Sequence, residues 1–264
     1  MEFEHLLYNV DNLVAKITLN RPETLNALTP SMRKSFAAAL ELAENDDSVR
    51  VIVITGAGKG FCSGGDVKAM NEARKLGKAS ALEDQIDPIR DRIVTAIRDS
   101  TKPIIAAVNG AAAGAGMNIA LACDIRIASD TAKFGETFAK RGLHPDWGGT
   151  YFLPRIVGMA KACELIWSGK MILAKEALKL GIVSQLETPS ALMTTTLEMA
   201  NSFAAGPPIA IRMAKRAIYR SMNSTLREAL EFETYAQNIC GGTQDAKEGI
   251  AAFVEKREPV FRGN

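Results

Sequence analysis

The sequence predicts an α/β core followed by a helical C-terminal region. Short apolar runs rich in β-branched residues alternate with helical patterns up to about residue 187. Such runs are typical of strands that are covered on both faces. From about residue 188 the pattern becomes purely helical. We therefore expect a core over residues 1–195 and a helical region over residues 196–264.

The first elements of the core are a strand, a loop and a helix. The segment LVAKITL (13–19) is the first expected strand, and a loop follows it. Thr29 is a suitable N-cap for a helix whose first residue is Pro30, where the missing N–H of proline carries no cost. The run Glu44-Asn45-Asp46-Asp47 ends this helix, and VRVIVITG (49–56) is the next strand.

The rest of the core alternates helical and strand patterns. Residues 66–100 have a helical pattern that is interrupted at Pro88, with an exposed or mobile charged stretch over residues 74–86. The remaining core strands are expected at 103–110, 124–130 and 182–186, and the helices at 158–168 and 173–180. Four helices complete the chain, at 189–204, 208–221, 224–239 and 243–257.

The composition is that of an ordinary globular protein. Of the 264 residues, 47% are hydrophobic and 23% are charged, which argues against a disordered or fibrous chain. Lys and Arg total 32 against 30 Asp and Glu, so charge gives no indication of nucleic-acid binding. The N-terminus has acidic residues where a signal peptide would have basic ones, so no signal peptide is expected. A long apolar run is also missing, so no membrane span is expected. Four scattered cysteines fit thiols in a reducing cytoplasm.

Three glycine-rich corners carry the functional information. In each, a buried strand ends and a turn of small residues opens a helix: TGAGKGFCSGGDVKAM (55–70), NGAAAGAGMNIALACD (109–124) and GLHPDWGGTYFLPRIVG (142–158). Small residues let a ligand approach the backbone closely, and a helix N-terminus presents unpaired N–H groups. Two such corners side by side could form an oxyanion hole. Alternatively, the glycines serve only turns and close packing. No phosphate loop or dinucleotide fingerprint is present.

The order and spacing of these corners resemble the crotonase (enoyl-CoA hydratase/isomerase) superfamily. The resemblance also includes ITLNRPETLNAL (17–28) and AFVEKREPVF (252–261), so it covers nearly the whole chain. It implies a spiral of ββα turns with a C-terminal helical trimerisation region. It also implies a bound acyl-CoA whose thioester carbonyl accepts two backbone N–H groups. By position these donors are Gly65 and Ala115, with Gly64, Asp66 and Gly114 beside them.

Departures from the family pattern bear on the reaction. Typical hydratases of this superfamily carry two glutamates that handle water, and Asn118 and Phe138 stand at those positions here. The third corner instead resembles the ring-1,2-epoxyphenylacetyl-CoA isomerase and Δ3,Δ2-enoyl-CoA isomerase branch, in which an Asp at the position of Asp146 handles protons. One carboxylate suffices to shift a proton between two carbons, and burial would raise its pKa usefully. As an alternative, Asp146 caps the helix that begins near Gly148.

Other side chains near the corners have alternative interpretations. Asn118 could orient a water or the acyl group, or could be satisfied by nearby backbone. Glu136 is interpreted as structural or exposed, His144 as a surface residue, and Cys62 as a small buried filler. Phe138 and Trp147 could line the acyl pocket or simply pack. By resemblance, CoA would contact Leu25 and Ala27 on the first loop and Lys68 after the first corner, while Phe253 and Lys256 of a neighbouring subunit would complete its site.

The leading hypothesis is a cytoplasmic acyl-CoA isomerase that assembles as a homotrimer or as a hexamer made of two trimers. Neither a metal nor a separate cofactor is implied, since coenzyme A is part of the substrate. Three alternatives stay open: a hydratase with nonstandard acid/base groups, a hydrolase or other enzyme that uses Asp146, and a non-catalytic CoA-binding or RNA-binding homologue. The near-neutral charge argues against RNA.

Overall fold

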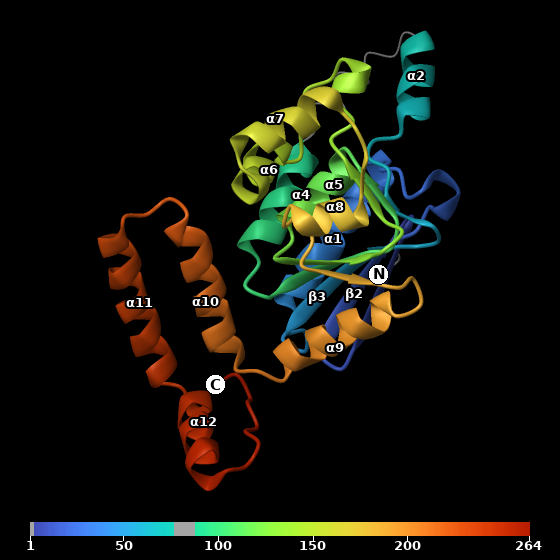
Figure 1. Ribbon diagram of the computed structural model, residues 1–264. Coiled ribbons are helices and arrows are strands. Elements are labelled where there is room, and N and C mark those ends of the chain that lie inside the picture. Colours follow the sequence, from blue (N-terminus) through green and yellow to red (C-terminus); the bar gives the residue numbers. More distant parts are fainter. Residues whose placement is uncertain (1–2, 77–87) are drawn as a thin grey trace.

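The computed structural model describes residues 3–76 and 88–264, and a six-stranded sheet lies at the centre of its core (Figure 1). The strand order is β1-β2-β3-β5-β7-β10, in which the first pair is antiparallel and the others are parallel. The strands are β1 (Leu6–Asp11), β2 (Val14–Leu19), β3 (Val51–Gly56), β5 (Ile104–Val108), β7 (Ile125–Ser129) and β10 (Gln185–Glu187). The sequence did not predict β1, and it placed β10 about three residues too early.

A second sheet of four very short strands lies beside the first, in the order β4-β6-β8-β9. Its strands are β4 (Gly60–Cys62), β6 (Ala111–Ala113), β8 (Lys133–Gly135) and β9 (Ile172–Leu173). None of them was predicted, because two or three residues are too few to show an alternating pattern.

Successive strands of the chain are added alternately to the large sheet and to the small sheet. β3, β5 and β7 each add to the large sheet, and the next strand in sequence, β4, β6 or β8, adds to the small one. A helix follows each pair. This repeated order is the expected spiral of ββα turns.

Successive side chains of the buried strands point to opposite faces of the large sheet, and a hydrophobic core packs on each face. Ile52 and Ile54 of β3 pack in the cluster that contains the apolar side of α1 (Pro30–Asn45). Val51 and Val53 point to the opposite face and pack with α9 (Leu192–Ala204). Each of these strands therefore reads as a continuous apolar run.

The expected helices of the core are present. Thr29 caps α1 as predicted, since its Oγ1 accepts a 3.2 Å hydrogen bond from the Met32 amide. The helical stretch interrupted at Pro88 corresponds to α2 (Val67–Lys75) and α4 (Pro88–Asp99), and most of the charged stretch at 74–86 lies outside the described residues. The others are α5 (Ala115–Ala122), α6 (Gly149–Val157), α7 (Met159–Ser168) and α8 (Ala174–Lys179), with single 3-10 turns η1 (Pro22–Thr24) and η2 (Ala139–Arg141).

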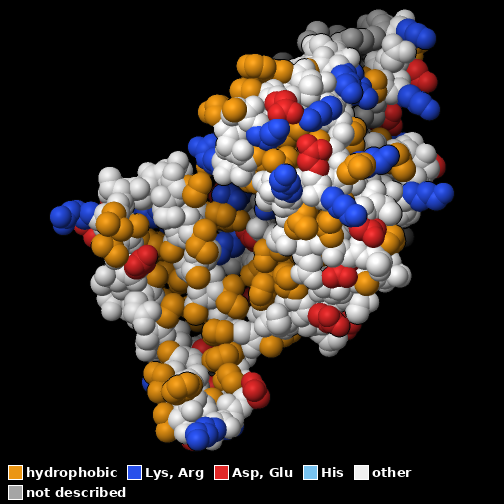
Figure 2. Space-filling view, viewed as in Figure 1, with side chains coloured by type: hydrophobic (Ala, Val, Ile, Leu, Met, Phe, Trp, Pro, Cys, Tyr) orange, Lys and Arg blue, Asp and Glu red, His pale blue; other side chains and the backbone are white. Residues whose placement is uncertain are grey.

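The C-terminal third is helical, as the sequence predicted. α11 (Leu226–Gly241) and α12 (Gln244–Glu255) lie apart from the core, whereas α10 (Pro208–Ser221) contacts it through the ion pair of Lys215 with Asp124 and α9 packs on the large sheet (Figure 1). Hydrophobic side chains gather in the hollow between these helices and the core (Figure 2). Within the described part of the chain, no helix has the length and apolar character needed to cross a membrane.

Candidate active site

The three glycine-rich corners converge in space. A Cβ placed on Gly64 would lie 2.8 Å from the carbonyl oxygen of Ala113 and 3.5 Å from the amide nitrogen of Ala115. Gly64 has a φ of +92°, and only glycine combines that backbone conformation with so close an approach. Asn118 of the second corner donates a 2.7 Å hydrogen bond to the carbonyl oxygen of Asp146 in the third. The second corner is thus in contact with both of the others.

A cavity of about 740 Å³ opens where the corners meet. A volume of this size suits a small organic ligand. Its lining combines backbone of all three corners with side chains of α1, α2 and α4. Among the lining residues are Gly64, Gly65 and Asp66 of the first corner, Gly114 and Ala115 of the second, and His144, Asp146 and Trp147 of the third, together with Phe138 from the segment before the third corner.

The backbone of Gly65 and of Ala115, the two residues expected to donate N–H groups, lines this cavity. Ala115 is the first residue of α5, so its N–H has no partner within the helix. Gly65 forms an isolated parallel bridge with Leu28. In such a bridge the hydrogen bonds run to the neighbours of Gly65, as in the 2.8 Å bond from the Leu28 amide to the Gly64 carbonyl. The Gly65 N–H itself is therefore directed away from Leu28.

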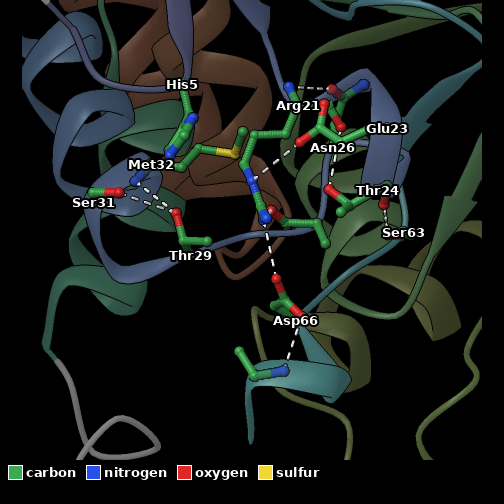
Figure 3. Close-up of polar contacts among 12 residues, drawn as sticks. His5, Arg21, Glu23, Thr24, Asn26, Thr29, Ser31, Met32, Ser63 and Asp66 are labelled. Carbon is green, nitrogen blue, oxygen red and sulfur yellow. Dashed lines mark hydrogen bonds and ion pairs between the residues drawn. The ribbon is translucent and has the colours of Figure 1, made fainter.

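The loop before α1 is held against the first corner by polar contacts (Figure 3). Arg21 donates to the Ala27 carbonyl at 2.8 Å and to Asp66 Oδ2 at 3.1 Å. The buried Asn26 amide donates to the Gly60 carbonyl at 2.8 Å and accepts from the Arg21 amide at 2.8 Å. Asp66 also accepts from the Ala69 amide at 3.1 Å. Asp66 therefore links the loop to α2, while still lining the cavity.

Asp146 enters the cavity from a strained turn. Trp147 has a φ of +54° and Gly148 a φ of +78°, a pair of left-handed residues that costs about 1–2 kcal/mol at the tryptophan. Trp147 is buried, which holds the turn in place. The N-cap of α6 is Gly148, with no side-chain cap. The alternative in which Asp146 caps this helix is therefore wrong, because the chain turns once more before the helix begins.

Arg90 of α4 is the cationic partner of Asp146. Its Nη1 lies 3.3 Å from Asp146 Oδ2. Asp146 Oδ1 is buried without a hydrogen-bond partner among the described residues. Burial raises the pKa of Asp146 above its ordinary value, and the Arg90 guanidinium opposes that shift. The result is a carboxylate with one free oxygen and increased basicity, which suits a general base.

Two fully buried polar side chains, Asn118 and Glu136, lie near the Asp146 backbone and do not line the cavity. The Asn118 amide donates a 2.7 Å hydrogen bond to the Asp146 carbonyl oxygen. A Cβ on Gly149 would lie 2.5 Å from Asn118 Nδ2, so only glycine leaves room for this contact. Glu136 Oε2 lies 3.5 Å from Asn118 Nδ2. The Asn118 amide nitrogen thus bonds to backbone, in line with one of the two alternatives left open, whereas its Oδ1 has no partner among the described residues. Glu136 is buried, so the interpretation that it is exposed is wrong.

The remaining predicted residues divide into those near the cavity and those far from it. Phe138, Trp147 and the exposed His144 line it. Leu25, Ala27 and the exposed Lys68 are not among the described lining residues. Phe253 and Lys256 lie on and just after α12, away from this cavity. Cys62 is buried, and burial raises its pKa to about 12, so it is an inert thiol as interpreted.

Sequence reasoning missed Arg90 and undervalued Glu136. Arg90 follows Pro88 in a charged segment that shows no motif, so nothing in the sequence distinguishes it from a solvated arginine. Glu136 directly follows β8, a strand of three residues that is too short to show a pattern in the sequence. The depth at which it is buried depends on packing between distant segments.

Comparisons with known proteins agree with this geometry. The family model described as Enoyl-CoA hydratase/isomerase matches residues 9–264. The chain is 38% identical over 260 residues to the short-chain-enoyl-CoA hydratase of Clostridium acetobutylicum, covering 98% of this chain and 97% of the relative. It is also 38% identical over 260 residues to the 1,2-epoxyphenylacetyl-CoA isomerase of Escherichia coli, covering 98% and 99%.

Solved structures show the same fold. The crystal structure of a putative enoyl-CoA hydratase/isomerase from Mycobacterium abscessus superposes with a TM-score of 0.94 at 34% identity, over 98% of this chain and 100% of that one. The match therefore includes the cavity and the C-terminal helices together. The chain belongs to the enoyl-CoA hydratase/isomerase family, the crotonase superfamily, as the order and spacing of its three glycine-rich corners predicted.

Proposed function

We propose that the protein is an acyl-CoA isomerase in which Asp146 is the single acid/base group. The observation that carries this proposal is the position of Asp146, which has a buried unpartnered Oδ1 in the same cavity as the N-terminus of α5. The two hydratase glutamate positions hold Asn118 and Phe138, and Asn118 is fully buried.

The reaction is a proton shift through an enolate. The carbonyl oxygen of the thioester in a 3-enoyl-CoA accepts hydrogen bonds from the backbone N–H groups of Gly65 and Ala115. Asp146 removes a proton from the carbon next to the carbonyl, and the electron pair of that C–H bond forms a dienolate whose oxygen the two N–H groups stabilise. Asp146 then returns the proton two carbons away, which moves the double bond into conjugation and restores the carboxylate.

The wider assembly is part of the same proposal. α12 exposes large apolar side chains, among them Phe253 at 86% and Val254 at 74%. Exposed apolar surface of this kind marks a contact site in many proteins. We propose that a second copy covers it in a homotrimer or a pair of trimers, which would also bring Phe253 and Lys256 toward a neighbouring CoA site.

Conversion of a 3-enoyl-CoA to the conjugated 2-enoyl-CoA, followed by absorbance of the conjugated thioester, tests the isomerase proposal. Asp146→Asn should lower kcat by about 10²–10⁴-fold while a non-reactive acyl-CoA analogue still binds. Asp130→Asn, at an exposed turn aspartate, is the matched control and should keep wild-type activity. Full activity of Asp146→Asn would overturn the proposal.

Hydration of a 2-enoyl-CoA is the second candidate, because the chain is equally similar to a hydratase and to an isomerase. The same two variants separate these functions. Hydration that survives in Asp146→Asn supports a hydratase with other groups, whereas solvent oxygen incorporated into Asp146 indicates nucleophilic chemistry. CoA binding without turnover of either substrate indicates a binding protein.

A further inference from the structure

Glu136 is a buried acid that no step of the proposed reaction uses. It follows β8, and its exposed fraction is 0%. Its carboxyl does not line the cavity but lies behind Asn118, whose amide holds the Asp146 carbonyl. Among the described residues, Glu136 Oε1 has no hydrogen-bond partner.

The hydrogen-bond pattern of Asn118 defines what Glu136 must supply. The amide nitrogen must face the Asp146 carbonyl, because that oxygen can only accept. The second hydrogen of this nitrogen is left for Glu136 Oε2. Asn118 Oδ1 and Glu136 Oε1 then remain as two buried acceptors without a donor in the described part of the chain.

One proton would satisfy both of these oxygens. A neutral Glu136 carries a hydroxyl that can donate to the Asn118 side-chain carbonyl, while its own carbonyl accepts from the Asn118 amide. With the other amide hydrogen on the Asp146 carbonyl, such a pair of acid and amide would use every donor and give each of the two buried oxygens a partner. An ionised Glu136 would leave two buried acceptors unsatisfied, and each such group costs about 1–3 kcal/mol.

The charged groups around Glu136 agree with a neutral carboxyl. α5 carries no ionisable side chain (AGMNIALA). Asp146 lies beyond Asn118, where its charge would repel an ionised Glu136. Other charged or titratable groups on neighbouring segments are engaged elsewhere or exposed: Arg90 with Asp146, Lys170 with Glu164, Arg141 with the Thr137 carbonyl, and the exposed Lys140 and His144. Burial, with the field of Asp146, raises the pKa of Glu136 to about 8.

We propose that Glu136 is a positioning residue that holds one proton behind Asp146 and orients Asn118, so that the pair of carboxyls carries one negative charge. This inference rests on the proposed isomerase function. The proton keeps the Asn118 amide aligned on the Asp146 carbonyl and thereby sets the position of the base. Loss of the proton would place a second negative charge beside the site in which the enolate develops.

Kinetics of three variants test the role. Glu136→Gln imitates the neutral acid, since its amide can donate to Asn118 and accept from it, and should keep kcat within about threefold at pH 7. Glu136→Met removes both hydrogen bonds and should lower kcat about tenfold or more with a smaller effect on KM. Glu198→Gln, at an exposed glutamate of α9, is the control and should match the wild type.

The pH profile carries the discriminating readout. Wild-type kcat should fall as pH rises through about 8, when Glu136 ionises. Glu136→Gln should remain active above that pH, because an amide has no proton to lose. Glu136→Gln that is as impaired as Glu136→Met at neutral pH, or an alkaline loss of activity that persists in Glu136→Gln, would overturn the proposal.

Infrared spectroscopy tests the protonation state without reference to activity. At about pH 7 the wild-type protein should show the carbonyl stretch of a neutral carboxylic acid, which disappears at about pH 10 and is missing in Glu136→Gln. A band that survives in Glu136→Gln contradicts the assignment. If the band behaves as expected but no isomerisation is detected, the proposed function and the positioning role fail while the neutral state of Glu136 stands.

Discussion

The Asn118 side-chain amide donates a 2.7 Å hydrogen bond to the backbone carbonyl of Asp146. Asn118 lies one turn along α5 from Ala115, the first residue of that helix. In the proposed reaction, the helix whose first N–H group would bind the thioester oxygen therefore also holds the turn that carries the proposed base. Their separation depends on one rigid element rather than on two independent loops.

Replacement of Asn118 by alanine should remove the anchor of the Asp146 turn while the Ala115 N–H group at the start of α5 stays in place. We expect kcat to fall about 10–100-fold, because the Asp146 turn loses its anchor and small misplacements of a base are costly. Unfolding in urea should show a loss of about 1–3 kcal/mol from unsatisfied buried groups. Asn201→Ala, at an exposed position of α9, serves as the control. Unchanged kcat in Asn118→Ala would contradict the anchoring role.

Ala115→Pro tests the oxyanion donor directly. Proline is tolerated at the first position of a helix, so the substitution removes one N–H without breaking α5. Activity should fall by about 10²–10³-fold, the usual effect of losing one such donor. Met159→Pro makes the same change at the exposed first residue of α7 and should leave kcat unchanged. Comparable activity in the two variants would exclude Ala115 as a donor.

Arg90→Met should move the acidic limb of the kcat/KM profile. Asp146 must be ionised to accept a proton, and the Arg90 guanidinium lowers the pKa of Asp146 against the effect of burial. Without that charge the limb should shift to higher pH by about one unit. Arg92→Met removes an exposed guanidinium from the same helix and should leave the profile in place. A shift of equal size in both variants would point to a long-range charge effect.

Glu136→Gln should stabilise the fold at neutral and alkaline pH. Below about pH 4.5, the ordinary pKa of this group, the carboxyl is protonated in both folded and unfolded states. Between about 4.5 and 8 the unfolded state loses the proton while the folded state keeps it, which favours unfolding. The gain from Glu136→Gln should therefore grow across this range to at most about 5 kcal/mol.

Urea denaturation at about pH 5, 7 and 9 measures that gain, with Glu198→Gln as the control. A difference between Glu136→Gln and wild type that does not vary with pH would show that Glu136 has the same pKa in both states.

Phe253→Asp should weaken self-association. The aromatic ring is 86% exposed on α12, and an acidic side chain there would oppose burial against a second copy. We expect a smaller molar mass by light scattering at micromolar concentration. Lys247→Asp introduces the same side chain at an exposed polar position of α12 and should leave the mass unchanged. A wild-type protein that is already monomeric would contradict the proposed assembly.

The sequence alone determined the elements with long and regular patterns. The apolar runs of β3 and β5, the capped start of α1 and the four C-terminal helices all follow from local periodicity and capping. The three corners also carried the family, because their glycines, their order and their spacing are linear properties of the chain.

Only the tertiary structure decided which side chains surround the base. The short strands of the second sheet have too few residues for a local signal, and they bring the corners together. Arg90 and Glu136 meet the Asp146 region from segments 56 and 10 residues away in the chain. Their charge states depend on burial and on partners that sequence neighbours do not specify. The corner residues of the site were therefore readable in the sequence, whereas the partners Arg90 and Glu136 and the electrostatics of the site arose from packing.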